Sequence, residues 1–227
     1  MRSSLSWLAS LAIAMAPLQV RAKAEDAAVR SQALSLVQTS WQHGLPFGRT
    51  QDLGPAALPT FHAVLRDPNS SQLWANAASA IGILADTTSF DTLRSFVWDR
   101  FSGEVDTRTY KALLLAQANI GPMAASSPRA LSYLEQTCRP KAWRKLAWQH
   151  GPRSGEALWQ VMSEMSIQAL SLSNSPRAKA ILEELRGVDP PLVDRAYLDE
   201  AIATNQKVRS LGLREFMRQF QKEKGGE

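Results

Sequence analysis

Residues Leu58 to Asp86 read LPTFHAVLRDPNSSQLWANAASAIGILAD, and this stretch decides the fold. An apolar segment with helical spacing is followed by Asp67-Pro68 and then by a second apolar segment rich in alanine. Because proline does not continue a helix, the dipeptide marks a break between two helices. The stretch therefore predicts a helix pair whose second member has the small side chains needed for close packing.

The helix pair recurs along the chain. The tetrapeptide SPRA occurs at 127–130 and again 48 residues later at 175–178, and each copy is followed at the same distance by Leu-Glu. Ser89 stands at the equivalent place, 38 residues before the first copy. Serine caps free backbone N–H groups at a helix start, and proline suits the first helical position. Spacings near 40–47 residues are typical of stacked helix pairs.

Three expected second helices have apolar residues at helical spacing. These residues are Trp74, Ala77, Ala78, Ile81, Leu84 and Ala85; then Leu113, Ala116, Ile120 and Met123; then Leu158, Val161, Met162, Met165, Ala169 and Leu172. A fourth, more polar pair is expected from Pro176 to Gly187 and from Val193 onward. No strand-like alternation persists, so the chain is predicted to be all-α, an α-solenoid of about four helix pairs.

The first pair resembles the unit of HEAT repeats, particularly the bilin-lyase-type subgroup. The family's "AAxALGxLGD"-type run is matched by Ala77, Ala78, Ala80, Ile81, Gly82, Leu84 and Asp86. The resemblance covers about residues 58–220 and is weakest at the end. It implies a surface that holds other molecules, and in the lyases a tetrapyrrole. One departure is Trp74, which stands where many such repeats place an arginine near Asp67, and this argues against an Asp–Arg ladder.

The first residues have the layout of a signal peptide. Arg2 precedes a short apolar run from Leu5 to Leu18, and Ala22-Lys23-Ala24 offers a cleavage site. We expect a signal peptide over residues 1–24, a leading helix and linker over 25–55, and a HEAT-like repeat domain with a C-terminal capping helix over 56–227. Asp26 to Gln42 is the leading helix, and His43 to Pro55 is the Gly/Pro-rich linker. The mature protein is then periplasmic or secreted.

Charge argues against nucleic acid as a partner. The expected leader holds three cations and no acidic residue, so its removal lowers the formal net charge from +5 to +2. The remaining charges are mixed along the chain rather than gathered into a basic stripe. Cys138 is the only cysteine, which leaves burial as a small apolar side chain or an intermolecular pair.

Catalytic and metal-binding patterns are not found in the sequence. His43, His62 and His150 have no ligand partner at metal-binding spacing, and no HExxH, CxxC, P-loop or G-x-S-x-G pattern occurs. Glu135, Glu164, Glu183 and Glu184 are the carboxylates that would have to converge for acid–base chemistry. We expect no catalytic, cofactor-binding or metal residues, no cofactor and no enzymatic activity.

Two segments are candidate contact sites. In KAWRKLAWQHGPR, aromatic and basic residues alternate, a combination found in interaction hot spots. The candidate partner contacts there are Trp143, Arg144, Lys145, Trp148 and Arg153. The alternative is that Trp143 and Trp148 belong to the core.

The chain ends in a basic amphipathic segment, VRSLGLREFMRQFQKEK. It is either the closing helix of the repeats or a membrane-surface helix, with Arg214, Phe216, Arg218 and Phe220 as the contacts. The sequence thus predicts an exported, non-catalytic scaffold of the cell envelope that binds a protein partner. The alternatives are peripheral membrane binding through this segment and a lyase-like holder of a small ligand. The oligomeric state stays open.

Overall fold

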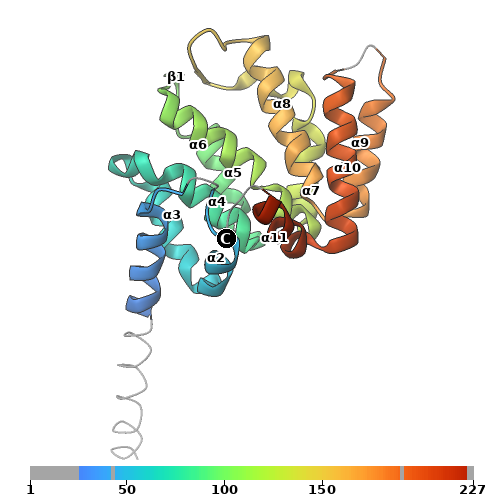
Figure 1. The fold of residues 1–227 in the computed structure, drawn as a ribbon. Coiled ribbons are helices and arrows are strands. Elements are labelled where there is room, and N and C mark those ends of the chain that lie inside the picture. Colours follow the sequence, from blue (N-terminus) through green and yellow to red (C-terminus); the bar gives the residue numbers. More distant parts are fainter. Residues whose placement is uncertain (1–25, 42–43, 190–191, 224–227) are drawn as a thin grey trace, which may run out of the picture.

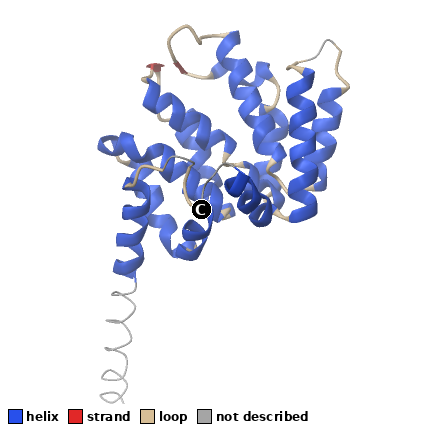
Figure 2. Cartoon of the chain, viewed as in Figure 1, coloured by secondary structure: helices blue, strands red, loops and turns tan. Residues whose placement is uncertain are grey.

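The computed structural model describes residues 26–41, 44–189 and 192–223, and these are almost wholly helical (Figure 2). A leading helix covers residues 26–38. The other α-helices are α2 (Phe47–Leu53), α3 (Leu58–Arg66), α4 (Trp74–Leu84), α5 (Phe90–Trp98), α6 (Thr107–Ala118), α7 (Pro128–Thr137), α8 (Glu156–Ser171), α9 (Pro176–Arg186), α10 (Arg195–Leu211) and α11 (Leu213–Glu223). Short 3₁₀ helices are η1 (Pro55–Ala57), η2 (Pro68–Leu73), η3 (Thr87–Ser89), η4 (Gly121–Ala125) and η5 (Pro140–Lys145).

The helices from α3 to α10 are arranged in pairs. Each first helix (α3, α5, α7 and α9) contacts the second helix that follows it (α4, α6, α8 and α10). The second helices also contact one another in succession, α4 with α6, α6 with α8, and α8 with α10. Among the first helices, α7 and α9 make a much smaller contact, and the other successive first helices of the described residues contact one another even less. Figure 1 shows the pairs following one another across the molecule.

The predicted helix starts, with a capping serine followed by proline, are found only in part. Ser127 Oγ accepts a hydrogen bond from Ala130 N at 3.2 Å, and Pro128 begins α7. Pro176 likewise begins α9, but Ser175 makes no side-chain cap. Ser89 is fully buried and does not cap α5 either, because its hydroxyl lies 2.8 Å from His62 Nε2. The serine cap is therefore confirmed at one of the three sites.

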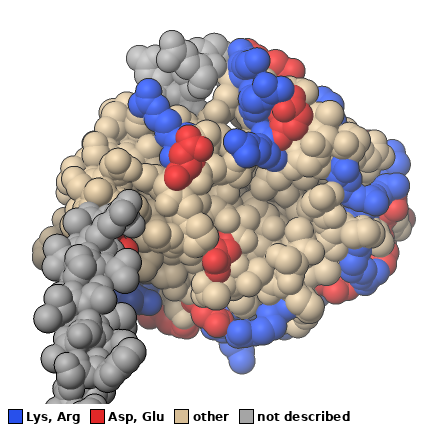
Figure 3. Space-filling model, turned by 90° about the horizontal axis from the view of Figure 1, so that it is seen from below, with Lys and Arg blue, Asp and Glu red and all other residues tan. Residues whose placement is uncertain are grey.

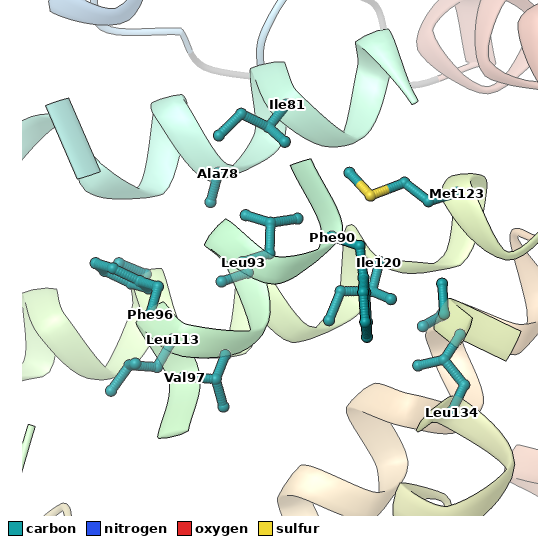
Figure 4. Packing of buried hydrophobic residues seen from close by; sticks show 14 of the residues in the cluster. Ala78, Ile81, Phe90, Leu93, Phe96, Val97, Leu113, Ile120, Met123 and Leu134 are labelled. Carbon is teal, nitrogen blue, oxygen red and sulfur yellow. The ribbon is translucent and has the colours of Figure 1, made fainter. Parts of the chain in front are cut away.

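The core is a continuous cluster that extends from the leading helix to α10. Figure 4 shows how side chains from α4, α5, α6, η4 and α7 meet in it, with Ile81, Leu93 and Leu113 among them. Alanine and glycine let the second helices approach closely. A Cβ added to Gly121 would lie 2.0 Å from the carbonyl oxygen of Ala169 in α8. The stack of second helices therefore depends on these small residues.

One expectation was wrong within the predicted linker. Residues Phe47–Leu53 form α2 instead of an irregular connection, and Phe47 is buried. The contact of α2 with α4 supplies an apolar surface that the local Gly/Pro-rich composition did not indicate. Tertiary packing outweighs local propensity in such short segments.

The C-terminal helix returns to the N-terminal part of the fold. Helix α11 contacts both α10 and α2, so it turns back from the last pair toward the segment that precedes the first pair (Figure 1). Gln221 forms two hydrogen bonds with this segment: its Nε2 donates to Leu45 O at 2.9 Å, and its Oε1 accepts from Phe47 N at 3.5 Å. Two short strands, β1 (Gly103–Glu104) and β2 (Trp148–Gln149), pair in parallel, and His150 and Arg153 form an isolated antiparallel bridge.

Candidate functional site

The predicted aromatic–basic contact is divided between core and surface. Trp143 and Trp148 are 0% and 2% exposed, so their side chains belong to the core and do not form a contact surface. The rings can be buried because both indole N–H groups have hydrogen-bond acceptors inside the protein. Trp143 Nε1 donates to Thr137 O at the end of α7 (2.7 Å), and Trp148 Nε1 donates to Val97 O near the end of α5 (2.8 Å). Both rings thus satisfy backbone carbonyls that lack a partner within their helix.

Two more tryptophans have the same role. Trp41 Nε1 donates to Leu36 O of the leading helix at 2.9 Å. Trp74 Nε1 donates to Val64 O and Asp67 O at the end of α3, both at 3.1 Å. Trp74 therefore satisfies two carbonyls at the end of α3 through its indole N–H. Four helix ends in the described residues are capped in this way.

The cationic part of the predicted contact remains on the surface. Arg144 and Lys145 are exposed at the end of η5, and Arg144 Nε donates to Lys141 O at 3.1 Å. Arg153 belongs to a different group, since its Nη1 donates to Tyr110 Oη in α6 at 2.7 Å. Of the five predicted contact residues, only Arg144, Lys145 and Arg153 are thus accessible.

A hydrogen-bonded chain of side chains crosses four helices beneath this surface. Trp98 Nε1 donates to Tyr133 Oη (2.9 Å), which donates to Gln117 Oε1 (2.7 Å), while Gln117 Nε2 donates to Ser166 Oγ (2.9 Å). Burial raises the pKa of Tyr133 far above its ordinary value, so the phenol stays neutral. The Trp98 ring also stacks on Trp143, with centroids 4.7 Å apart. These contacts fix α5, α6, α7 and α8 relative to one another.

The histidines form no metal site in the described residues. His62 Nε2 faces Ser89 Oγ, and the pKa of His62 is lowered by burial and by Arg66, against an opposing effect of Asp86. Ser89 is fully buried, whereas His62 is half-buried. His150 stacks on Tyr110 with centroids 4.4 Å apart, and its Nδ1 lies 2.8 Å from Val105 O. His43 lies outside the described residues. No group of three or more metal-ligating side chains occurs in the described ranges.

Cys138 is buried at the end of α7. Its side chain is 0% exposed, and Sγ lies 3.1 Å from Glu135 O. Burial raises the pKa of the thiol to about 11. The thiol therefore stays protonated near neutral pH, and the intermolecular disulfide left open by the sequence would require Cys138 to become exposed first.

Shallow clefts lie between neighbouring helices along the side of the first helices. Four of them have volumes from about 380 to 530 Å³. They lie between the leading helix and α2, the leading helix and α3, α3 and α5, and α5 and α7. The first helices contact one another little in this part of the chain, which leaves these grooves open. Sequence reasoning missed them, because the residues that line each groove come from two helices that are separated along the chain.

Two ion pairs bridge successive first helices. Arg129 and Arg177 are the arginines of the two SPRA copies. Arg129 pairs with Asp91 of α5 (2.9 Å), and Arg177 pairs with Glu135 of α7 (2.5 Å). Both pairs are exposed, and exposed ion pairs add little to stability. The two ion pairs help to set how neighbouring helix pairs are aligned with one another.

The C-terminal helix α11 packs against the rest of the protein with only part of its surface. No residue of α11 is fully buried: Phe216 is half-buried and stacks on Phe220, which is 44% exposed. Arg214 is exposed, and Arg218 forms a two-bond ion pair with Glu215 at 2.8 Å. In Figure 3, which views the molecule from below, most charged side chains lie toward the margins of the face, and acidic side chains also lie within its broad uncharged area. The four predicted membrane-contact residues therefore stay at least partly accessible.

No protein-family model, curated protein or solved structure matches this chain. Of the described helices, none combines the length and apolar character that a membrane span requires. The expected leader lies outside the described residues.

Proposed function

We propose that this protein is an exported, non-catalytic HEAT-like helical-repeat module that binds a protein partner in the cell envelope. The observation that carries the proposal is the order of helix contacts. Each first helix contacts the second helix that follows it, and the second helices contact one another in succession. This order of contacts supports an α-solenoid. Solenoids of this type use extended surfaces for binding, because their side chains are presented by rigid helices along the stack.

The grooves between first helices and the cations of η5 supply contact chemistry. Arginine and aromatic side chains are enriched at interaction hot spots. Arg129 lies over the Phe90 ring at 5.6 Å beside the groove between α5 and α7. Arg144 and Lys145 extend the cationic surface beyond the first helices.

The test is site-specific photo-crosslinking in cells. A photoreactive amino acid is placed at Ser95 on α5, at Arg144 on η5, and at Lys207 on α10 as the control position; all three are exposed. We expect one dominant protein adduct from Ser95 or Arg144, identified by mass spectrometry, and none from Lys207. The same adducts should persist when Cys138→Ser removes the thiol. Equal adducts at all three positions, or no protein adduct at any, would refute the proposal.

A second candidate is peripheral membrane binding through α11. Exposed Leu211 and Phe220 lie on or beside this helix, with the exposed cation Arg214 near them. Deleting residues 210–227 should then abolish co-sedimentation with phosphatidylglycerol-containing vesicles, and high salt should weaken it in the intact chain. The lyase-like ligand holder has less support, since among the four clefts described only one includes a tryptophan, Trp41.

A further inference from the structure

The cations of η5 belong to a stretch of the chain without carboxylates. Residues 136–155 include five arginines and lysines and no aspartate or glutamate. Three of the five, Lys141, Arg144 and Lys145, lie within η5 and are exposed; we call these three residues the η5 cationic patch. None of the three forms an ion pair with a carboxylate of the described residues. This part of the surface therefore has an excess of positive charge.

The geometry of a 3₁₀ helix places the three cations on the outer side of η5. Such a helix has three residues per turn, so side chains three positions apart lie one above the other. Trp143 is buried and Pro140 is half-buried, so the side of η5 that they share faces the core. Lys141 and Arg144 share the next side, and Lys145 follows Arg144 directly. The three cations thus lie within two turns of one short helix.

Arg144 is held in place while part of its guanidinium stays free. Its Nε donates to Lys141 O at 3.1 Å within η5. Its two terminal nitrogen atoms have no hydrogen-bond or ion-pair partner among the described residues. Trp143 fixes η5 itself, because its ring stacks on Trp98 and its N–H donates to Thr137 O. A carboxylate can therefore accept two parallel hydrogen bonds from a guanidinium that is already oriented.

The carboxylates of neighbouring elements do not neutralise the η5 cationic patch. Helices α7 and α8 pack against η5. Glu135 of α7 is paired with Arg177, and Glu164 of α8 accepts a hydrogen bond within its own helix. Glu156 at the start of α8 and Asp99 after α5 are exposed, and neither forms an ion pair with a described residue of η5. The charge of the patch is therefore available to an external anion.

We propose that the η5 cationic patch binds an acidic segment of a partner protein, with Arg144 as the bidentate donor to one carboxylate and the two lysines contacting adjacent ones. The proposal rests on the proposed interaction function and names the chemistry of the partner. An anionic bilayer suits the patch less well, because helices that lie on membranes also insert apolar side chains. Trp143 is 0% exposed, and Leu146 is half-buried and packs against the core. The partner segment therefore has several Asp or Glu residues close together.

The test measures binding of a fluorescently labelled peptide, in which aspartate and glutamate alternate with serine, to the full chain by fluorescence anisotropy. We expect binding that weakens as the salt concentration rises, because salt screens exposed charges. Arg144→Gln should reduce the affinity about tenfold, as expected for loss of a charge-assisted hydrogen bond. Arg144→Lys should restore part of it, because lysine keeps the charge without the planar fork.

Two further variants keep the test decisive. Lys145→Glu reverses one charge of the patch without removing the hydrogen bond of Arg144 to Lys141, and it should weaken binding at least as much as Arg144→Gln. Lys207→Gln is the matched control, since Lys207 is an exposed cation of α10 without an ion pair among the described residues. This variant lowers the net charge as much as Arg144→Gln does and should bind as the wild type does.

The outcomes separate this site from the broader function. No binding of the acidic peptide, equal binding to wild type and Lys145→Glu, or an equal loss with Lys207→Gln would overturn the proposed site. Tighter binding to phosphatidylglycerol vesicles than to the peptide, lost in the same variants, would overturn the protein partner in favour of a lipid surface. The interaction function itself is decided by photo-crosslinking: a dominant adduct from Ser95 alone leaves it standing without this patch, and no adduct at any position refutes it.

Discussion

Replacing Gly121 by alanine tests the close packing of the second helices. An added Cβ would lie 2.0 Å from Ala169 O, 2.7 Å from Ala169 C and 2.9 Å from Ala169 Cα. Because an ordinary contact begins near 3.4 Å and these atoms are backbone, no side-chain rotation relieves the clash. Helix α8 and η4 must separate by roughly 1 Å, and such overpacking costs about 3 kcal/mol.

The assay is thermal unfolding followed by circular dichroism, with urea unfolding as a second measurement. For a chain of this size, about 3 kcal/mol lowers Tm by roughly 6–12 °C. Gly48→Ala is the matched control: this glycine lies in α2, is exposed, and an added Cβ would meet nothing within 4 Å. It should leave Tm unchanged or raise it slightly, since alanine favours the helix. A Gly121→Ala protein that unfolds within 2 °C of the wild type would refute the close approach of η4 to α8.

Three other predictions concern the caps and the thiol. Trp143→Phe leaves Thr137 O without its donor and should cost about 2 kcal/mol in urea unfolding, whereas the exposed Arg144→Ala should cost almost nothing. Cys138 should react with a thiol reagent far more slowly in the folded protein than in urea, because burial raises its pKa to about 11. Asp106→Ala removes the cap on Thr109 N and should cost about 1 kcal/mol at pH 7. Since these hydrogen bonds lower the pKa of Asp106, the wild-type advantage should be present above the ordinary carboxyl pKa and shrink as the pH falls through the lowered one.

Different results would contradict each of these. Equal stability of Trp143→Phe and wild type would mean that the indole does not cap α7. Rapid modification of Cys138 in the native protein would place the thiol at the surface. A difference between Asp106→Ala and wild type that stays constant down to pH 2 would show that the cap does not depend on an ionised carboxylate.

The repeat signals in the sequence determined the helical class and most helix positions. SPRA starts two first helices, and the apolar spacing from Trp74 to Ile81 identifies the buried face of α4. These features are local, because caps and helical periodicity act within a few residues. The burial of Cys138, expected as one of two alternatives, is confirmed.

Which of the candidate contact residues are accessible depends on the tertiary structure. Trp143 and Trp148 look like hot-spot residues in the chain, but their N–H groups reach carbonyls 6 and 51 residues away, so they are buried. Helix α2 also depends on a distant partner, α4. The groove between α3 and α5 is lined by residues of two helices, and no spacing rule predicts such a convergence. The helices could therefore be predicted from the sequence, because they depend on interactions within one or two turns. The surfaces between helices could not, because they depend on contacts between residues far apart in the chain.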